Sequence, residues 1–182
     1  LKNCRIVDGT GAPWFRGTIG ISDGRIETVI RDSTAELAAK QIIDVNDLAV
    51  APGFIDLHSH SDLRLFAEPE LYPKTMQGIT TETLGQDGFS MAPMYRQGGQ
   101  AEWEDHLSGL DGRPEREWTW GSLSEYLDAI KDDGVSPNVG TLIGHGTVRY
   151  NVMGMDLRSP SESELMEMAD LVTEALEDGA VG

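Results

Sequence analysis

The chain has 182 residues, of which 39% are hydrophobic, and its formal net charge is −17. This size and apolar content suffice for a hydrophobic core, and no apolar run approaches the ~20 residues of a membrane-spanning helix, so we expect a globular protein without a membrane partner. The acidic excess also disfavours nucleic acid as a partner, because nucleic acids bind basic surfaces. The single cysteine, Cys4, excludes an internal disulfide and is typical of a reducing compartment, which predicts a cytoplasmic location.

Residues 1–50 have the pattern of a small β subdomain. Two runs of alternating apolar and polar residues flank Asp23-Gly24, a pair that predicts a tight hairpin turn because such turns require positive φ angles. Residues 35–40 are expected to form one helical turn, and residues 41–45 a further strand. This segment lacks the strand–helix repeat of a barrel, so we expect it to form a domain of its own.

From residue 51 onward, strand patterns alternate with helix patterns. Ser122 with Glu125, and Ser159 with Glu162, have the spacing of capping boxes that begin helices. A long loop excursion that carries three tryptophans is expected between the second strand and the helix at Ser122. The expected elements are, in chain order, strand 54–60, helix 68–77, strand 78–86, excursion 93–121, helix 122–133, strand 139–146, helix 160–178 and the start of a strand at 180–182.

Repeated strand–helix units predict an α/β fold with parallel strands and helices outside them. A closed (β/α)₈ barrel takes ~250 residues, whereas residues 51–182 hold three units and the start of a fourth. We therefore expect the N-terminal portion of a TIM-type barrel in residues 51–182, preceded by the β subdomain. An open half-barrel would leave a strand edge unpaired, which is an aggregation hazard, so the chain is expected to be part of a longer protein.

A candidate metal site lies in the first predicted barrel strand. His58 and His60 are separated by one residue, and because side chains alternate along a strand, both are expected on one face together with Asp56 and Asp62. Zinc accepts imidazole nitrogens, and the active sites of such barrels lie at the carboxyl ends of the strands. A His-x-His pair also occurs by chance on exposed surfaces, but its place at the entry to a barrel favours a metal site.

The segment APGFIDLHSHSD resembles the first-strand motif of the amidohydrolase superfamily. The segments VDGTGAP, QGITTETLGQDGFSMAP, GHGTVRYNVMG and EALEDGAVG are similar, in collinear order, to the N-acyl-D-amino-acid deacylases (D-aminoacylases). The resemblance implies that His58 and His60 are zinc ligands and that residues 1–50 form part of a composite β-sandwich. In that family the next ligand is commonly a cysteine, and Asp87 stands at its position here. The resemblance therefore implies Asp87 as the third ligand, with a mere turn residue as the alternative.

The function that the resemblance implies is hydrolysis of a carbon–nitrogen bond other than a peptide bond. An N-acyl-D-amino acid would be cleaved to a D-amino acid and a carboxylate by a metal-bound hydroxide, with one or two divalent ions, zinc or another, as cofactor. The family's catalytic aspartate and its remaining ligands lie on later strands, outside these residues, so the chain alone is expected to be inactive. The acyl group, the amino acid and the oligomeric state stay open.

Three further residues are weaker candidates for contact with the substrate or for support of the ligands. His145 is expected at the end of the third strand, with simple packing as an equal alternative. Arg149 follows it in the expected loop and could bind a substrate carboxylate, although an ordinary ion pair is the favoured alternative. Asp62, beyond the two histidines, could hold a ligand in place.

Two other functions remain open at this point. One is a cyclic-amide hydrolase of the same superfamily, related to hydantoinases, dihydropyrimidinases or dihydroorotases, which typically use a carboxylated lysine on a later strand. The other is a non-catalytic metal-binding or interaction module. A lysine ligand on a later strand would favour the first, and the absence of the later histidines and aspartate would favour the second.

Overall fold

A computed structural model describes residues 1–182, which divide into two compact units, Leu1–Gly53 and Phe54–Gly182. Each unit has buried apolar residues of its own. None of the helices combines the length and the apolar character that crossing a lipid bilayer requires.

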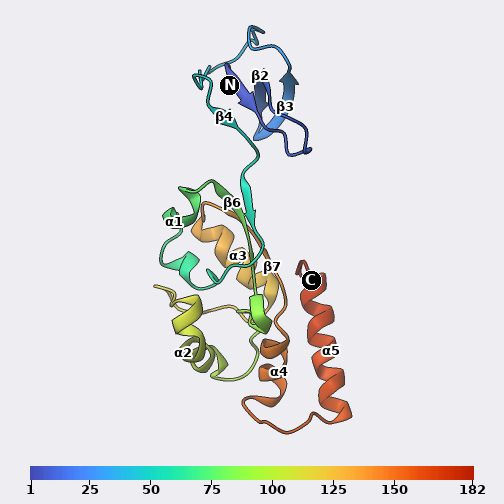
Figure 1. Ribbon diagram of the computed structural model, residues 1–182. Helices are drawn as coiled ribbons and strands as arrows, with labels where there is room; N and C mark the ends of the chain where they lie inside the picture. The colour runs from blue at the N-terminus through green and yellow to red at the C-terminus, as the bar shows by residue number, and fades with distance from the viewer. The chain divides into compact units, whose positions relative to one another are not determined.

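The first unit is a four-stranded sheet with the order β3-β2-β1-β4 (Figure 1). Its pairs β1–β2 and β2–β3 are antiparallel, and β1–β4 is parallel. The predicted hairpin joins β2 to β3, and both turn residues, Asp23 (φ 49°) and Gly24 (φ 73°), have the positive φ that a two-residue turn requires. The strands are β1 (Cys4–Ile6), β2 (Phe15–Ser22), β3 (Arg25–Ile30) and β4 (Ala49–Val50).

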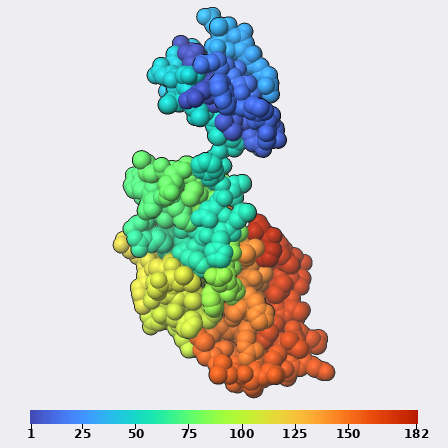
Figure 2. Space-filling model, viewed as in Figure 1, coloured from blue at the N-terminus to red at the C-terminus, as the bar shows by residue number.

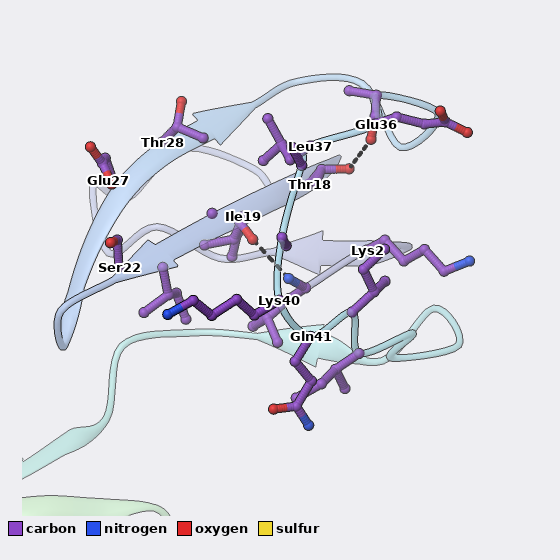
Figure 3. A pocket seen from close by; sticks show the side chains of 18 of the residues that line it. Lys2, Thr18, Ile19, Ser22, Glu27, Thr28, Glu36, Leu37, Lys40 and Gln41 are labelled. Carbon is purple, nitrogen blue, oxygen red and sulfur yellow. Dashed lines mark hydrogen bonds between the residues drawn. The ribbon is translucent and has the colours of Figure 1, made fainter.

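Two sequence predictions in this unit are wrong. Residues 35–40 do not form a helical turn, and residues 41–45 contribute only an isolated bridge between Lys2 and Asp44. A single helical turn is unfavourable by itself, because its nucleus fixes several residues for one hydrogen bond. The segment instead lies along β2, and the Thr18 hydroxyl donates a hydrogen bond to the Ala35 carbonyl at 3.5 Å. Residues of this segment and of β2 line an open hollow (Figure 3).

The second unit is built on a parallel sheet with the order β5-β6-β7, so strands consecutive in the chain are neighbours. In the space-filling view its segments form one continuous body (Figure 2). Its elements are β5 (Phe54–Asp56), α1 (Tyr72–Thr75), β6 (Ile79–Leu84), α2 (Gly99–Asp111), α3 (Leu123–Asp133), β7 (Asn138–Thr141), α4 (His145–Met153) and α5 (Glu162–Glu177), with 3₁₀ turns at Arg64–Phe66 and Gln86–Gly88.

The chain after α5 returns to the sheet. The Val181 N–H donates to the Thr141 carbonyl at 2.9 Å, and the Ile143 N–H donates to the Gly182 carbonyl at 2.9 Å. These hydrogen bonds place residues 180–182 beside the end of β7, where the sequence predicts the start of a further strand.

The excursion predicted for residues 93–121 contains the helix α2, which the sequence analysis missed. The helix begins after Gly98, whose missing side chain supplies no cap, so the usual signal of a helix start is absent. Its buried face instead stabilises it: Trp103 and Leu107 pack into the main core, together with Trp120 from the end of the excursion. The indole N–H of Trp120 donates to the Met91 carbonyl at 2.9 Å, so this tryptophan belongs to the core and not to an exposed surface.

The capping boxes are present, one of them displaced. Ser122 and Glu125 begin α3 as predicted. At α5 the box consists of Ser161 and Glu164 instead of Ser159 and Glu162, because the Ser161 hydroxyl accepts the Glu164 N–H at 3.3 Å while the Glu164 carboxylate accepts the Ser161 N–H at 2.7 Å. The Arg158 guanidinium also binds this carboxylate and, together with the cap, holds the pKa of Glu164 well below its usual range.

The strand predicted over 139–146 ends early, at Thr141, and His145 begins α4. Arg149 therefore lies in a helix and not in a loop. The chain turns at Gly144, where a Cβ atom would lie 2.5 Å from the Gly88 carbonyl oxygen, so only glycine permits this close approach of two backbones.

Ser122→Ala is expected to lower the free energy of unfolding by about 1 kcal/mol, because the Glu125 N–H loses its partner at 3.1 Å. Urea denaturation of the full-length protein measures the change. Ser122→Gly is the matched control, and its expected cost is only a few tenths of a kcal/mol, since glycine leaves the helix end open to water. Equal costs for alanine and glycine would contradict a capping role.

Candidate metal centre

The two histidines lie after β5 and not within it, because this strand ends at Asp56. The alternation predicted from the sequence therefore fails at this point. The Asp56 carboxylate turns to Lys74 of α1, at 3.0 Å, and also accepts the His58 N–H at 3.2 Å. Asp56 thus holds the bend from which the histidine segment starts, and it does not share a face with the imidazoles.

The imidazoles nevertheless converge on one carboxylate. Oδ2 of Asp87 lies 3.5 Å from Nε2 of His58 and 3.3 Å from Nε2 of His60. One candidate donor atom from each of the three residues lies within 4.8 Å of the other two. Atoms about 2.1 Å from a tetrahedral zinc ion are separated by roughly 3.4 Å, so the two measured separations match the edges of such a coordination shell. The nitrogen and oxygen donors also suit zinc and other divalent ions.

Asp87 is presented by a strained turn after β6. Its own φ is 55°, a left-handed value that aspartate tolerates better than most residues. The preceding Gly85 has a φ of 73°, and a Cβ atom there would lie 2.3 Å from the Leu142 carbonyl oxygen. The turn therefore requires glycine at this position, and it directs the exposed Asp87 carboxylate toward the two histidines.

Two buried carboxyl groups lie behind His60. Asp111, the last residue of α2, places Oδ1 at 3.3 Å from Nδ1 of His60, and Asp62 accepts the Gly85 N–H at 3.0 Å. Burial and the charge of Asp111 raise the pKa of Asp62 well above its usual range. Burial likewise raises the pKa of Asp111, against the opposing effect of His60. Asp62 thus joins the histidine segment to the turn that carries Asp87.

Asp62 was a sequence candidate for such support, and its hydrogen bond to Gly85 joins the segment of His58 and His60 to the turn of Asp87. Asp111 was missed, because it lies 51 residues from His60 in a helix that the sequence did not reveal. A usable signal is the spacing of Trp103, Leu107 and Asp111, which puts an acidic residue in line with two core positions.

A second missed cluster supports the histidine segment from the other side. Lys74 of α1 donates to Asp56 at 3.0 Å and to the fully buried Glu82 of β6 at 3.0 Å, and it also contacts the Ser59 hydroxyl. The Ser59 hydroxyl donates to the same Glu82 oxygen at 2.5 Å. The cluster therefore binds α1, β5 and β6 to the residue between the two histidines.

The model of the amidohydrolase family matches residues 41–182 of the chain. The chain belongs to this family. The family resemblance that the sequence motifs indicated is confirmed.

Two relatives of the chain are proteins of Alcaligenes xylosoxydans xylosoxydans. The N-acyl-D-aspartate deacylase is 37% identical over 182 residues, which are 100% of the chain and 35% of the relative. The D-aminoacylase is 34% identical over the same 182 residues, 36% of its own length. The chain therefore spans about a third of the length of these relatives.

Two solved structures of proteins with similar names also resemble the chain. An N-acyl-D-glutamate deacylase from Bordetella bronchiseptica, in complex with zinc and a phosphonate mimic of the tetrahedral intermediate, has a TM-score of 0.80 and 35% identity, and the match covers 100% of the chain and 36% of that protein. A D-aminoacylase with a binuclear metal centre has a TM-score of 0.78 and 31% identity, with 37% of its chain covered. The α/β fold predicted for the chain is confirmed.

The remaining sequence candidates, His145 and Arg149, are not part of the cluster of His58, His60 and Asp87. His145 is exposed at the start of α4 and borders an apolar groove with Val148 and Met168. The Arg149 guanidinium donates to the carbonyl oxygens of Asp156 and Arg158, each at 2.7 Å. Arg149 therefore forms no ion pair and does not contact His58, His60 or Asp87. Its hydrogen bonds instead stabilise the loop between α4 and α5.

Proposed function

We propose that the protein is a metal-dependent hydrolase that cleaves the amide bond of N-acyl-D-amino acids to a D-amino acid and a carboxylate. The observation that carries the proposal is the convergence of His58, His60 and Asp87 at the spacing of ligands around one cation. Relatives named D-aminoacylase and N-acyl-D-aspartate deacylase, which align with the whole chain, support this substrate class. Zinc, which the related deacylase structure contains, or another divalent ion is the proposed cofactor.

The proposed architecture is the first part of a (β/α)₈ barrel over residues 51–182, with residues 1–50 as part of a composite β-sandwich. Parallel strands in consecutive order, with helices between them, support the barrel. The ligands support it as well, since His58 and His60 follow β5 and Asp87 follows β6. All three thus lie at the carboxyl ends of neighbouring strands, which is where barrel enzymes place their active sites. The lone buried Cys4 supports the proposed cytoplasmic location.

His58, His60 and Asp87 would hold the cation. When bound, a divalent ion lowers the pKa of water and polarises an amide carbonyl. The imidazoles contribute neutral nitrogen donors, so the site keeps positive charge for polarising the substrate, while Asp87 contributes one negative charge and a second oxygen. The Asp87 side chain is 55% exposed, so a cation can reach it from solvent. Asp56, Asp62 and Gly85 fix the two segments that carry the ligands.

Substrate discrimination by the full-length protein tests this function. N-acetyl-D-amino acids should be hydrolysed, their L enantiomers should not, and a chelator should stop the reaction until zinc is restored. Hydantoins and dihydropyrimidines are the comparison substrates, because the cyclic-amide reading predicts turnover of those rings instead. Hydrolysis of the rings without hydrolysis of acyl-D-amino acids would overturn the proposal in favour of that alternative.

Asp87→Cys is expected to change metal preference, because a thiolate is a softer ligand than a carboxylate. Zinc should bind more tightly relative to manganese, with a gain of about tenfold or more in the ratio of the two association constants. Competition titrations with both ions measure the ratio. Asp105→Cys, an exposed position on α2, is the control for adding a thiol. An unchanged ratio in the Asp87 variant would mean that Asp87 is only a turn residue.

A further inference from the structure

The His60 ring is enclosed by two carboxylates, one at each nitrogen. Nε2 faces Asp87 at 3.3 Å, and Nδ1 faces Asp111, also at 3.3 Å. Asp87 is exposed, whereas the side chain of Asp111 is 1% exposed and sealed beneath the ring. The two carboxylates therefore have different environments, and only the exposed one can share a cation that enters from solvent.

Asp111 occupies a position that packing alone would give to an apolar residue. The buried residues of α2 are Gly99, Trp103, Leu107 and Asp111, at a spacing of four, so they form one face of the helix. A carboxylate on such a face is costly to bury unless a hydrogen bond compensates it. Among its side-chain oxygens, Oδ1 reaches His60 and Oδ2 has no hydrogen-bond partner. Core packing therefore does not account for an acid here, and the contact with His60 does.

The position of Asp111 is fixed by the backbone around it. Its carbonyl oxygen accepts the Leu63 N–H at 3.3 Å, which joins the end of α2 to the turn that follows His60. The helix ends immediately afterwards at Gly112, with a φ of 82°. The carboxylate is thus placed against the ring by the same contact that brings the two segments together.

We propose that Asp111 is a positioning residue that accepts the Nδ1–H of His60, and thereby orients the ring with the lone pair of Nε2 directed at the metal. A neutral imidazole carries one proton, and a nitrogen that binds a cation cannot carry it. With Nε2 as the donor to the cation, the proton therefore lies on Nδ1, where the Asp111 carboxylate can accept it. Hydrogen bonds of this kind to ligand histidines fix the tautomer and increase ligand basicity. The inference rests on the proposed metal-dependent function and adds a residue to its site.

The tautomer of His60 tests the inference without any metal. Asp87→Gly removes the carboxylate that competes for the proton at Nε2 and suits the φ of 55° at this position. Nitrogen-15 NMR of this metal-free full-length variant at about pH 8, where free imidazole is neutral, should show His60 protonated on Nδ1. In Asp111→Asn the amide can donate to Nδ1, which favours protonation on Nε2. Zinc affinity of this variant should fall about 10–100-fold. Asp105→Asn, on the exposed side of the same helix, is the matched control and should change neither quantity.

The possible failures can be told apart. Protonation on Nε2 in the Asp87→Gly variant would overturn the role given to Asp111, and this measurement does not depend on whether Asp111→Asn folds. Unchanged zinc affinity in a folded Asp111→Asn variant would overturn it as well. A protein with both side chains intact that binds no zinc would instead overturn the proposed function.

Discussion

Replacing both His58 and His60 with alanine is expected to remove zinc from the full-length protein and to lower hydrolysis of N-acyl-D-amino acids by about three orders of magnitude or more. The physical reason is that two of the three converging donor atoms disappear, and the pKa of the attacking water is then no longer lowered to about 7. Metal content by mass spectrometry and steady-state turnover measure the two effects.

The control for this double replacement is His106→Ala. His106 is an exposed histidine of α2 whose ring contacts Trp103, so its loss removes an imidazole without touching the cluster. The control should retain its zinc and its turnover. A His58/His60 double variant that folds and still holds one equivalent of zinc at native affinity would contradict the assignment of the site.

Lys74→Met is expected to lower the free energy of unfolding by about 3–5 kcal/mol, because it leaves the buried Glu82 carboxylate without its cation. Urea denaturation of the unsubstituted protein and of the Lys74→Met variant measures the loss, if each unfolds in a single transition. The affinity for zinc should fall as well, since Lys74 also holds Asp56 and Ser59 on either side of His58.

A second substitution separates loss of charge balance from loss of packing. Adding Glu82→Gln to Lys74→Met removes the unpaired charge and keeps an acceptor for the Ser59 hydroxyl, so most of the stability should return. If Lys74→Met alone changed the free energy of unfolding by less than about 0.5 kcal/mol, the value typical of surface positions, the cluster would have no structural importance.

Local signals explain what the sequence predicted correctly. The Asp23-Gly24 hairpin and the Ser122 capping box each depend on residues within a few positions of one another, so their chemistry can be recognised without tertiary contacts. The strand–helix order likewise follows from short patterns. It was confirmed as an α/β fold in which β5, β6 and β7 are parallel neighbours.

Tertiary contacts determine the structural features that could not be predicted from the sequence. The helix α2 has no capping side chain, and it depends on the burial of Trp103 and Leu107, which its sequence shows only weakly. Residues 35–40 have helix-forming composition, but they lie along β2 instead. The end of β7 is set by the contact of Gly144 with Gly88, two residues that are far apart in the chain.

The candidate site contains some residues that local sequence signals predict and others that only tertiary contacts bring to it. His58 and His60 were found by their spacing, although the expected cause was wrong, since they converge through a bend after Asp56 and not through the pleat of a strand. Asp87 was found through the family resemblance, and the structure brings it to both imidazoles. Asp111 and Lys74 were not predicted, because each reaches the site from a helix whose side chains meet the histidine segment only in the folded protein.

The most direct test of the metal centre is a crystal structure of the full-length protein with zinc, with the ion located by anomalous scattering at its absorption edge. We expect a peak about 2.0–2.2 Å from Nε2 of His58, from Nε2 of His60 and from a carboxylate oxygen of Asp87. A zinc ion bound elsewhere, with these three side chains turned away from one another, would contradict this expectation.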